Sequence, residues 1–359
     1  MGYNLTEVVN NYFNMDVSSD PFGEGHINDT YLAKIVPDRH VIQRINHHVF
    51  HNPEKLMENI MMVTEHLRAK IIARDGNPER ETLKMIKTLD GKDYYKSEDG
   101  NYFRVYMFVD DVDVYQTVEQ PELFYKAARA FGRFQKDLAD FPADRLFETI
   151  PNFHNTKVRF EALQQAIKKD KVGRKNRVRD EIEFALARKK CASVVTGAIE
   201  KGEIPLRVTH NDTKLNNVLF DSKTGEGICV IDLDTVMPGS LLYDFGDAIR
   251  FGASTAAEDE KDLSKVECSL ELFEAFTKGF LEELGGTLTE KEVKLLAFSA
   301  KLITYECGMR FLTDYLNGDE YFKIHRPEHN LDRCRTQFKL VADMEGKMGK
   351  MEDIVRKYV

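Results

Sequence analysis

Residues His210–Asn217 read HNDTKLNN, and residues Ile231–Asp234 read IDLD. In the first run Asp212 stands two residues after His210, and Asn217 follows five residues after Asp212. A carboxylate and an amide oxygen at this short spacing suit a site that accepts a proton and holds a hard cation such as Mg²⁺. The two runs therefore predict a polar centre built on short loops.

The chain between these runs predicts a tight β-hairpin. Val218–Phe220 and Ile228–Ile231 are rich in strand-forming residues, and Thr224–Gly227 (TGEG) is a turn sequence. A hairpin returns the chain beside its start. We therefore expect Asn217 and Asp232 to converge on one ion.

The spacing of His, Asp and Asn in the first run is that of protein-kinase catalytic loops. Through Val208–Asn217, Ile231–Thr235 and Met237–Ser240, the chain resembles the aminoglycoside phosphotransferase and choline kinase superfamily. Within that superfamily it is similar to the N-acetylhexosamine 1-kinases. The resemblance covers essentially the whole chain, with further matching stretches at Gly23–Asn28, Tyr243–Thr255 and Glu306–Phe311.

The resemblance implies an α+β, bilobal protein-kinase-like fold. It places a nucleotide-binding lobe of antiparallel strands with one helix at residues 1–110, with a hinge near 106–111. Residues 112–359 are expected to form a larger, mostly helical lobe for catalysis and substrate binding. A chain of 359 residues is long enough for two such lobes.

Five residues are expected to carry the phosphoryl transfer. Asp212 is the expected general base, and Lys214 resembles the lysine that neutralises the transferring phosphoryl group, with a plain surface lysine as the alternative. Asn217 and Asp232 are the expected Mg²⁺ ligands. Asp234 is expected either behind them or on a second metal ion.

ATP is the expected cofactor, together with Mg²⁺. Gly23 and Gly25 allow backbone amides to approach phosphate oxygens, although Gly-x-Gly also occurs in ordinary turns. The third strand lacks the phosphate-pairing lysine of protein kinases, and Gln43 or Arg44 takes its place. Backbone groups of Met107 to Val109 are candidates for the adenine edge, with an ordinary edge strand as the alternative.

The substrate assignment follows from the resemblance. It implies transfer of the ATP γ-phosphoryl group to the anomeric 1-hydroxyl of N-acetylglucosamine or N-acetylgalactosamine, which gives the sugar 1-phosphate and ADP. The residues that it points toward the sugar, beside Asp212, are His26, Phe251, Glu306, Arg310 and Tyr321. A surface ion pair is the alternative for Glu306 and Arg310, which lie four residues apart in an expected helix. Alternatives for the whole chain are an aminoglycoside, choline or homoserine kinase, or a catalytically silent nucleotide-binding module.

Composition and charge exclude several other classes of protein. A net charge of −9 argues against a nucleic-acid surface. Five widely spaced cysteines without metal-ligand spacing predict reduced thiols. The N-terminus shows no leader pattern, and no apolar run approaches about 18 residues, so we expect a cytoplasmic protein without a membrane partner.

Local signals predict several elements directly. Leu5 to Phe13 reads as an amphipathic helix, and Asn52 with Pro53 begins another. Thr289 and Glu292 form a capping box for a helix that reaches about Asn317, with Gly318 past its end. Helical periodicity also runs through Val178–Glu200. After Pro238, Asp244 and Asp247 open a helix, where we expect them to orient the catalytic loop, with substrate contact as the alternative.

Overall fold

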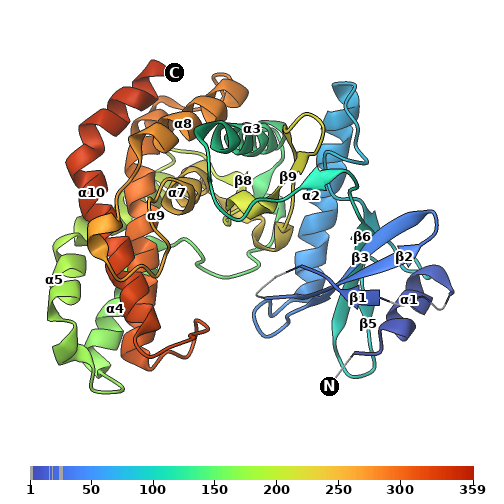
Figure 1. Cartoon of the computed structure of the whole chain (residues 1–359), viewed down its shortest axis with the longest axis horizontal. Coiled ribbons are helices and arrows are strands. Elements are labelled where there is room, and N and C mark those ends of the chain that lie inside the picture. The colour runs from blue at the N-terminus through green and yellow to red at the C-terminus, as the bar shows by residue number, and fades with distance from the viewer. Residues whose placement is uncertain (1–2, 16, 18, 24–26) are drawn as a thin grey trace. The chain divides into compact units, whose positions relative to one another are not determined.

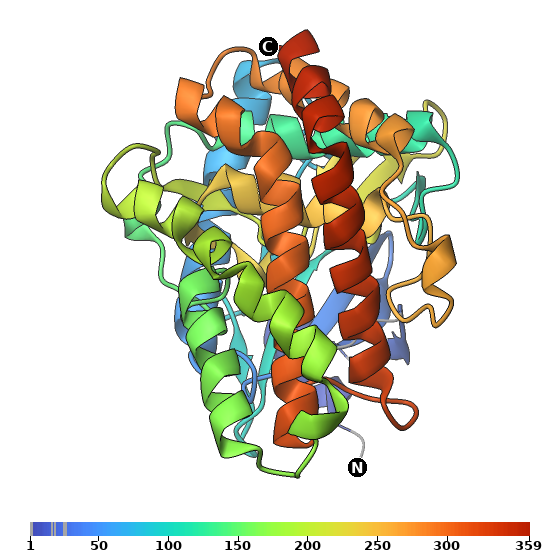
Figure 2. The same ribbon diagram turned by 90° about the vertical axis from the view of Figure 1, so that its left-hand side faces the viewer.

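The computed structural model describes residues 3–15, 17, 19–23 and 27–359 (Figures 1 and 2). The chain divides into two compact units. The first contains Met1–Val114, Asp140–Pro151 and Val218–Pro238, and the second contains Tyr115–Ala139, Asn152–Asn217 and Gly239–Val359. Strands dominate the first unit and helices the second, as expected for an α+β protein.

An antiparallel sheet forms the centre of the first unit, in the order β1-β2-β3-β6-β4 with β5 beside β6. Helix α1 (Leu5–Phe13) buries Val8, Val9 and Tyr12 in a core with Ile42 and Phe103 of this sheet. The strands are β1 (Ser19–Pro21), β2 (Asp29–Ile35), β3 (Asp38–Ile45), β4 (Met85–Ile86), β5 (Tyr95–Lys96) and β6 (Tyr102–Met107).

Helix α2 (Pro53–Ala73) joins two distant segments to the first unit. Its N-cap is Asn52, as predicted, with the side chain accepting the Lys55 amide at 3.1 Å. Within the helix, the buried Asn59 amide group donates to the carbonyls of Phe147 and Val236 at 2.7 and 3.0 Å. These bonds show why 140–151 and 218–238, which lie in the expected second lobe by sequence, belong to this unit.

The predicted hairpin after the catalytic loop is present in the first unit. Strands β9 (Val218–Asp221) and β10 (Gly227–Val230) pair antiparallel, and β7 (Val112–Asp113) adds a third strand beside β9. Arg80 holds the β9 end, because its Nη1 lies 2.7 Å from the Asp221 carboxylate. The short strand β11 (Met237–Gly239) follows.

The second unit is built from long helices. Helix α9 (Glu290–Asn317) packs against α10 (His329–Lys357), α7 (Leu241–Gly252) and α4 (Thr156–Lys169), and Figure 2 shows α9 and α10 side by side. The remaining elements are α3 (Pro121–Asp137), α5 (Arg179–Ala187), α6 (Val194–Glu200), α8 (Leu270–Leu284) and the strand β8 (Arg207–Thr209). Within the described residues, no helix is both long and apolar enough to span a membrane, and all five cysteines are free.

Two local predictions for the second unit are confirmed and one is wrong. The capping box of Thr289 and Glu292 is confirmed, as is the end of α9 at Asn317 with a left-handed Gly318. The continuous helix over Val178–Glu200 is wrong, because a 3₁₀ turn separates α5 from α6. Before that turn the Arg188 guanidinium reaches Glu345 of α10 at 2.7 Å, a tertiary contact that helical periodicity does not encode.

Candidate active site

The catalytic loop of the second unit brings Asp212, Lys214 and Asn217 together. The Lys214 ammonium lies 2.7 Å from the Asp212 carboxylate. The Asn217 amide nitrogen donates to the Asp212 carbonyl at 2.8 Å and to its carboxylate at 3.2 Å. The Asp212 backbone amide donates to Nδ1 of His210 at 3.2 Å. The loop therefore fixes the backbone of Asp212 while its half-buried carboxylate faces a cation.

The charges around Asp212 favour its ionised form. Burial by itself raises the pKa of a carboxyl group. Here the charge and hydrogen bond of Lys214, with smaller contributions from His210 and Arg250, outweigh burial and lower the pKa of Asp212. An ionised carboxylate is the form that can accept a proton from a substrate hydroxyl.

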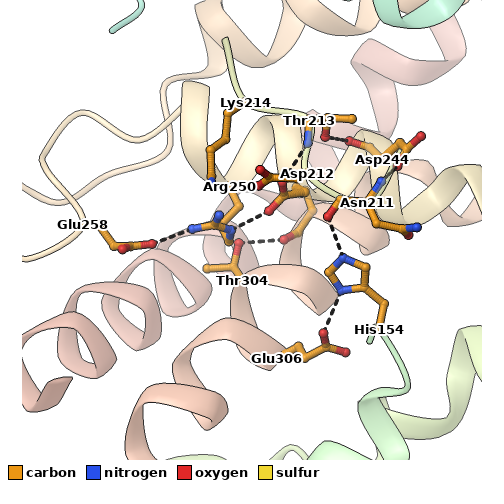
Figure 3. Close-up of polar contacts among 12 residues, drawn as sticks. His154, Asn211, Asp212, Thr213, Lys214, Asp244, Arg250, Glu258, Thr304 and Glu306 are labelled. Atoms are coloured by element: carbon orange, nitrogen blue, oxygen red, sulfur yellow. Dashed lines mark hydrogen bonds and ion pairs between the residues drawn. The ribbon is translucent and has the colours of Figure 1, made fainter. Parts of the chain in front are cut away.

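Helix α7 holds this loop through two acidic side chains, of which Figure 3 labels Asp244. The two oxygens of the buried Asp244 carboxylate accept the backbone amides of His210 and Asn211 at 2.9 and 2.7 Å. One turn later, Asp247 accepts the Thr213 amide at 3.1 Å. Both acids orient the loop, and this confirms the prediction made for them.

The side chain of Asn217 is oriented for an additional ligand. Its nitrogen is committed to Asp212, which leaves the amide oxygen as the group that can meet a cation. Among the described residues no three acidic, histidine or cysteine side chains form a ready metal cluster. Magnesium sites of phosphoryl-transfer enzymes commonly use only one or two protein ligands together with the phosphates.

In the first unit, Asp232 and Asp234 have different environments. Asp232 is exposed, with a left-handed backbone (φ 60°) at the start of a 3₁₀ turn. Asp234 is buried, and its carboxylate pairs with Arg104 and accepts a hydrogen bond from the Asn28 side chain. Asp232 is thus accessible to a ligand, whereas Asp234 is held inside the unit.

Arg104 is a residue that sequence reasoning missed. It lies on β6 with 3% of its surface exposed, between Phe103 and Val105 of the core. Its Nε and Nη2 donate to the Gln43 side-chain oxygen at 2.9 and 2.7 Å, and its Nη1 pairs with Asp234. The one available signal was a cation inside an otherwise apolar strand.

The other nucleotide-site predictions fall at separate places in the first unit. Arg44 pairs with Asp29 at 2.6 Å, so its charge is engaged on the sheet. Gly23 has φ 76°, a conformation that favours glycine. Gly25, like His26, lies outside the described residues. The amides of Met107 and Phe108 donate to the carbonyls of Lys84 and Arg39, both at 2.9 Å. An adenine bound at this segment would therefore have to pair with backbone carbonyls of Met107 to Val109 or with the backbone amide of Val109.

Of the substrate residues predicted in the second unit, Arg310 and Tyr321 lie together, beside the rings of Phe153 and Phe322. Its guanidinium carbon lies 5.2 Å from the ring centre of Phe153, 5.4 Å from that of Phe322 and 6.0 Å from that of Tyr321. The buried Asp314 carboxylate fixes the loop that carries Tyr321 and Phe322, because it accepts the backbone amides of residues 320–322 at 2.8 to 3.0 Å. Phe251 is half-buried near the end of α7.

A second guanidinium, Arg159, accompanies Arg310. Its nitrogens donate to the Phe153 carbonyl at 3.2 and 3.0 Å. Burial and the charge of Arg310 lower the pKa of Arg159. In the described part of the chain neither guanidinium has a carboxylate within ion-pair distance. Arg159 was not among the sequence candidates, since a lone arginine in a helix carries no functional signal.

Glu306 is buried and does not form the surface ion pair considered for it. One of its oxygens lies 2.8 Å from Nδ1 of His154, and the other accepts the Thr156 hydroxyl at 2.5 Å. The second ring nitrogen of His154 lies 3.2 Å from the Asn211 carbonyl oxygen (Figure 3). The Glu306 carboxylate is therefore committed to the support of the catalytic loop. His154 is a further residue that the sequence analysis missed.

Comparison with known proteins assigns the chain to a family. The model of the phosphotransferase enzyme family (APH) matches residues 19–267. An aminoglycoside phosphotransferase from Alicyclobacillus acidocaldarius subsp. acidocaldarius is 13% identical, with 99% of this chain and 98% of that chain covered and a TM-score of 0.63. A microcompartment-associated aminopropanol kinase is 14% identical, with 97% and 98% covered and a TM-score of 0.59.

A choline kinase from Cryptosporidium parvum Iowa II is 13% identical, with 93% of this chain and 90% of that chain covered and a TM-score of 0.57. At such identities the structural matches establish the fold alone. The family model spans more than half of the chain. This chain therefore belongs to the phosphotransferase enzyme family.

Proposed function

We propose that this protein is an ATP-dependent N-acetylhexosamine 1-kinase. The anomeric oxygen of the sugar attacks the γ-phosphorus of ATP, the bond from that phosphorus to the β,γ-bridging oxygen breaks, and ADP leaves. Asp212 accepts the hydroxyl proton, and Lys214 offsets charge on the transferring group. The ionised state favoured at Asp212 by its neighbours supports this role for the base.

Asn217 and Asp232 are the proposed Mg²⁺ ligands. The amide oxygen of Asn217 and the exposed carboxylate of Asp232 are hard oxygen donors, which is the chemistry that Mg²⁺ prefers. Bound Mg²⁺ would supply positive charge to the phosphates. Asp234 is already paired with Arg104, so we assign it to holding the loop of Asp232 in preference to a second metal ion.

The observation that carries the substrate proposal is the pair of guanidiniums around Phe153. Choline and aminoglycosides are cations, and a quaternary ammonium is recognised by open aromatic rings. Around Arg310 the rings already face a guanidinium, and Arg159 adds a second positive charge nearby. This environment disfavours a cationic acceptor and favours a neutral one rich in hydroxyl and carbonyl acceptors.

An acetamido sugar meets these requirements. The Arg310 guanidinium can donate to ring hydroxyls and to an amide carbonyl, while Phe251 and Tyr321 offer flat apolar surface for the acetyl methyl group. A site that hydrogen-bonds an amide discriminates against a ligand that lacks it, because its polar groups are left unpaired. We therefore expect N-acetylglucosamine and N-acetylgalactosamine to be used in preference to glucose and galactose.

The test is ADP release from Mg-ATP in the presence of single acceptors. The panel contains both N-acetylhexosamines, glucose, galactose, choline, homoserine and kanamycin, and NMR locates the phosphate on any product. Phosphate on the anomeric oxygen of the acetamido sugars supports the proposal. Phosphate on the 6-hydroxyl, or turnover of choline, homoserine or kanamycin in preference to the sugars, would overturn the substrate assignment and leave the kinase family intact.

Arg310→Met sharpens this test, since it keeps much of the side-chain volume and removes the donors. We expect the KM for N-acetylglucosamine to rise and the KM for ATP to stay near that of the parent. Lys301→Met is a matched control on the same helix, because Lys301 is engaged with Glu345 of α10. An equal rise in KM for both variants would remove Arg310 from the sugar site.

A further inference from the structure

The buried histidine of the second unit contacts two groups that can only accept hydrogen bonds. His154 is 8% exposed, and its ring nitrogens face the Glu306 carboxylate at 2.8 Å and the Asn211 carbonyl oxygen at 3.2 Å. A neutral imidazole has one N–H and one lone pair. Either neutral tautomer would therefore turn a lone pair toward one of these oxygens.

The other oxygen of the Glu306 carboxylate has a hydrogen-bonding partner of its own. It accepts the Thr156 hydroxyl at 2.5 Å. Burial of Glu306 favours its protonated form, but the contacts with His154 and Thr156 outweigh burial and lower the pKa of Glu306. Each oxygen of Glu306 thus has a hydrogen-bonding partner, and both contacts favour the ionised carboxylate.

A second buried histidine in the same unit shows the opposite arrangement. Nε2 of His329 lies 3.0 Å from the Asp259 carboxylate, but Nδ1 accepts the backbone amide of His325 at 3.2 Å. One acceptor and one donor match a neutral ring. Burial and the charge of Arg333 lower the pKa of His329, in agreement with that neutral form. Two histidines in one unit, each beside a carboxylate, are thus distinguished by their second partner.

The carbonyl that His154 meets belongs to the residue before the proposed base. Asn211 has a left-handed backbone with φ 66°, a conformation that few residues other than glycine, asparagine and aspartate adopt. Its amide donates to Asp244 at 2.7 Å, and its carbonyl faces His154. The Asp244 carboxylate at the amide and the His154 ring at the carbonyl together hold this peptide.

We propose that His154 is a buried imidazolium, paired with Glu306, that positions the catalytic base by holding the Asn211 carbonyl. The charged neighbours of Glu306 besides His154 are Arg310 on the same helix and Arg159 on α4, and the centre of the Tyr243 ring of α7 lies 5.3 Å from that of the histidine ring. Glu306 supplies the negative charge that offsets the imidazolium. The positioning role rests on the proposed function of Asp212, whereas the charge state of the ring does not.

The charge state is tested by NMR on the full chain labelled with ¹⁵N-histidine. Comparison with His154→Gln and His329→Gln assigns the two ring systems. At neutral pH we expect both nitrogens of His154 to carry protons and only one nitrogen of His329. In Glu306→Gln, which keeps the shape but removes the charge, His154 should lose the second proton. A singly protonated His154 in the folded parent protein would overturn the proposal.

The positioning role is tested by kinetics with Mg-ATP and N-acetylglucosamine. Displacing a reacting group by about 1 Å costs roughly 10²-fold in rate, so we expect kcat of His154→Gln to fall by about 10- to 100-fold. The KM for ATP should stay within about twofold, because nucleotide contacts are not removed. His329→Gln, the matched control, should keep kcat. Circular dichroism establishes that each variant is folded.

The outcomes separate this inference from the proposed function. A folded His154→Gln with parental kcat, or equal losses in His154→Gln and His329→Gln, would overturn the positioning role. If the parent phosphorylates none of the acceptors, the substrate proposal fails, while the ring NMR spectra still decide whether His154 is an imidazolium.

Discussion

Each unit of this protein places a buried pair of side chains behind a loop that carries an aspartate with a proposed role in the reaction. In the first unit Arg104 pairs with Asp234, two residues after Asp232. In the second, His154 pairs with Glu306 and meets the carbonyl before Asp212. The cations differ in kind. A guanidinium keeps its charge at all working pH values, whereas an imidazole is the side chain that gains and loses charge near neutrality.

The difference teaches how each loop is held. The Arg104 guanidinium also donates twice to Gln43, so the cation that pairs with Asp234 is itself held on the sheet. The loop of Asp212 instead depends on a proton carried by His154. The two loops thus differ in what stands behind them, a forked guanidinium in the first unit and the His154–Glu306 pair in the second.

The largest expected effect on turnover comes from replacing Asp232, which precedes the Arg104–Asp234 pair by two residues. Asp232→Ala should reduce turnover to the background rate at all Mg²⁺ concentrations, because the phosphates lose the ion that neutralises their charge. Initial rates over a Mg²⁺ titration measure this. A variant that responds to Mg²⁺ as the parent does would show that the metal is held elsewhere.

The corresponding change in the other loop is expected to be smaller. Asp212→Asn keeps the shape of the side chain but removes the proton acceptor, so kcat should fall by roughly 10²–10⁴-fold. Nucleotide affinity, measured by calorimetry, should stay at the parental value. Parental turnover in this variant would exclude Asp212 as the base.

A third change tests how much the Arg104–Asp234 pair contributes to the free energy of unfolding. Arg104→Met leaves the Asp234 carboxylate buried without its cation, and removing one member of a buried pair costs about 3–5 kcal/mol. Arg44→Met is the comparison on the adjacent strand, because the Asp29 side chain of this pair is 44% exposed and the Arg44 side chain 12% exposed, so solvent should offset part of the loss. Denaturant unfolding measures both. Equal losses would contradict the distinction between the buried and the exposed pair.

The smallest expected effect is the pH dependence of the stability that Glu306 contributes. The pKa of Glu306 is lowered in the folded state, where His154 and Thr156 outweigh the effect of burial. The unfolded chain then binds more protons at mildly acidic pH, so this contribution to stability is present above the ordinary carboxylate pKa. It is lost as pH falls through the lower pKa of the folded state.

Unfolding midpoints of the parent and of Glu306→Gln, compared between neutral and acidic pH, measure this effect. The stability gap between them should narrow as pH falls. A gap that stays constant or widens toward acidic pH would contradict the assignment of Glu306 as an ionised acceptor. A control with Glu290→Gln, an exposed position at the start of the same helix, should show no such trend.

The parts of the site that sequence predicted are those encoded by short spacing. The loop of Asp212, Lys214 and Asn217 closes on itself within six residues, and the hairpin after it is a local turn. The capping box of α9 is likewise local. Such patterns persist in any fold, because their partners are a few residues apart and the backbone geometry brings them together.

The amino-acid sequence by itself thus indicated the family and the α+β class, and it predicted the residues of the loop around Asp212. Only the tertiary structure decided which cations stand behind the loops. Arg104 and Asp234 are 130 residues apart and His154 and Glu306 are 152 apart, so no local pattern links them. Burial within each unit selects these partners, because a charge taken out of water must find an opposite charge or a hydrogen bond.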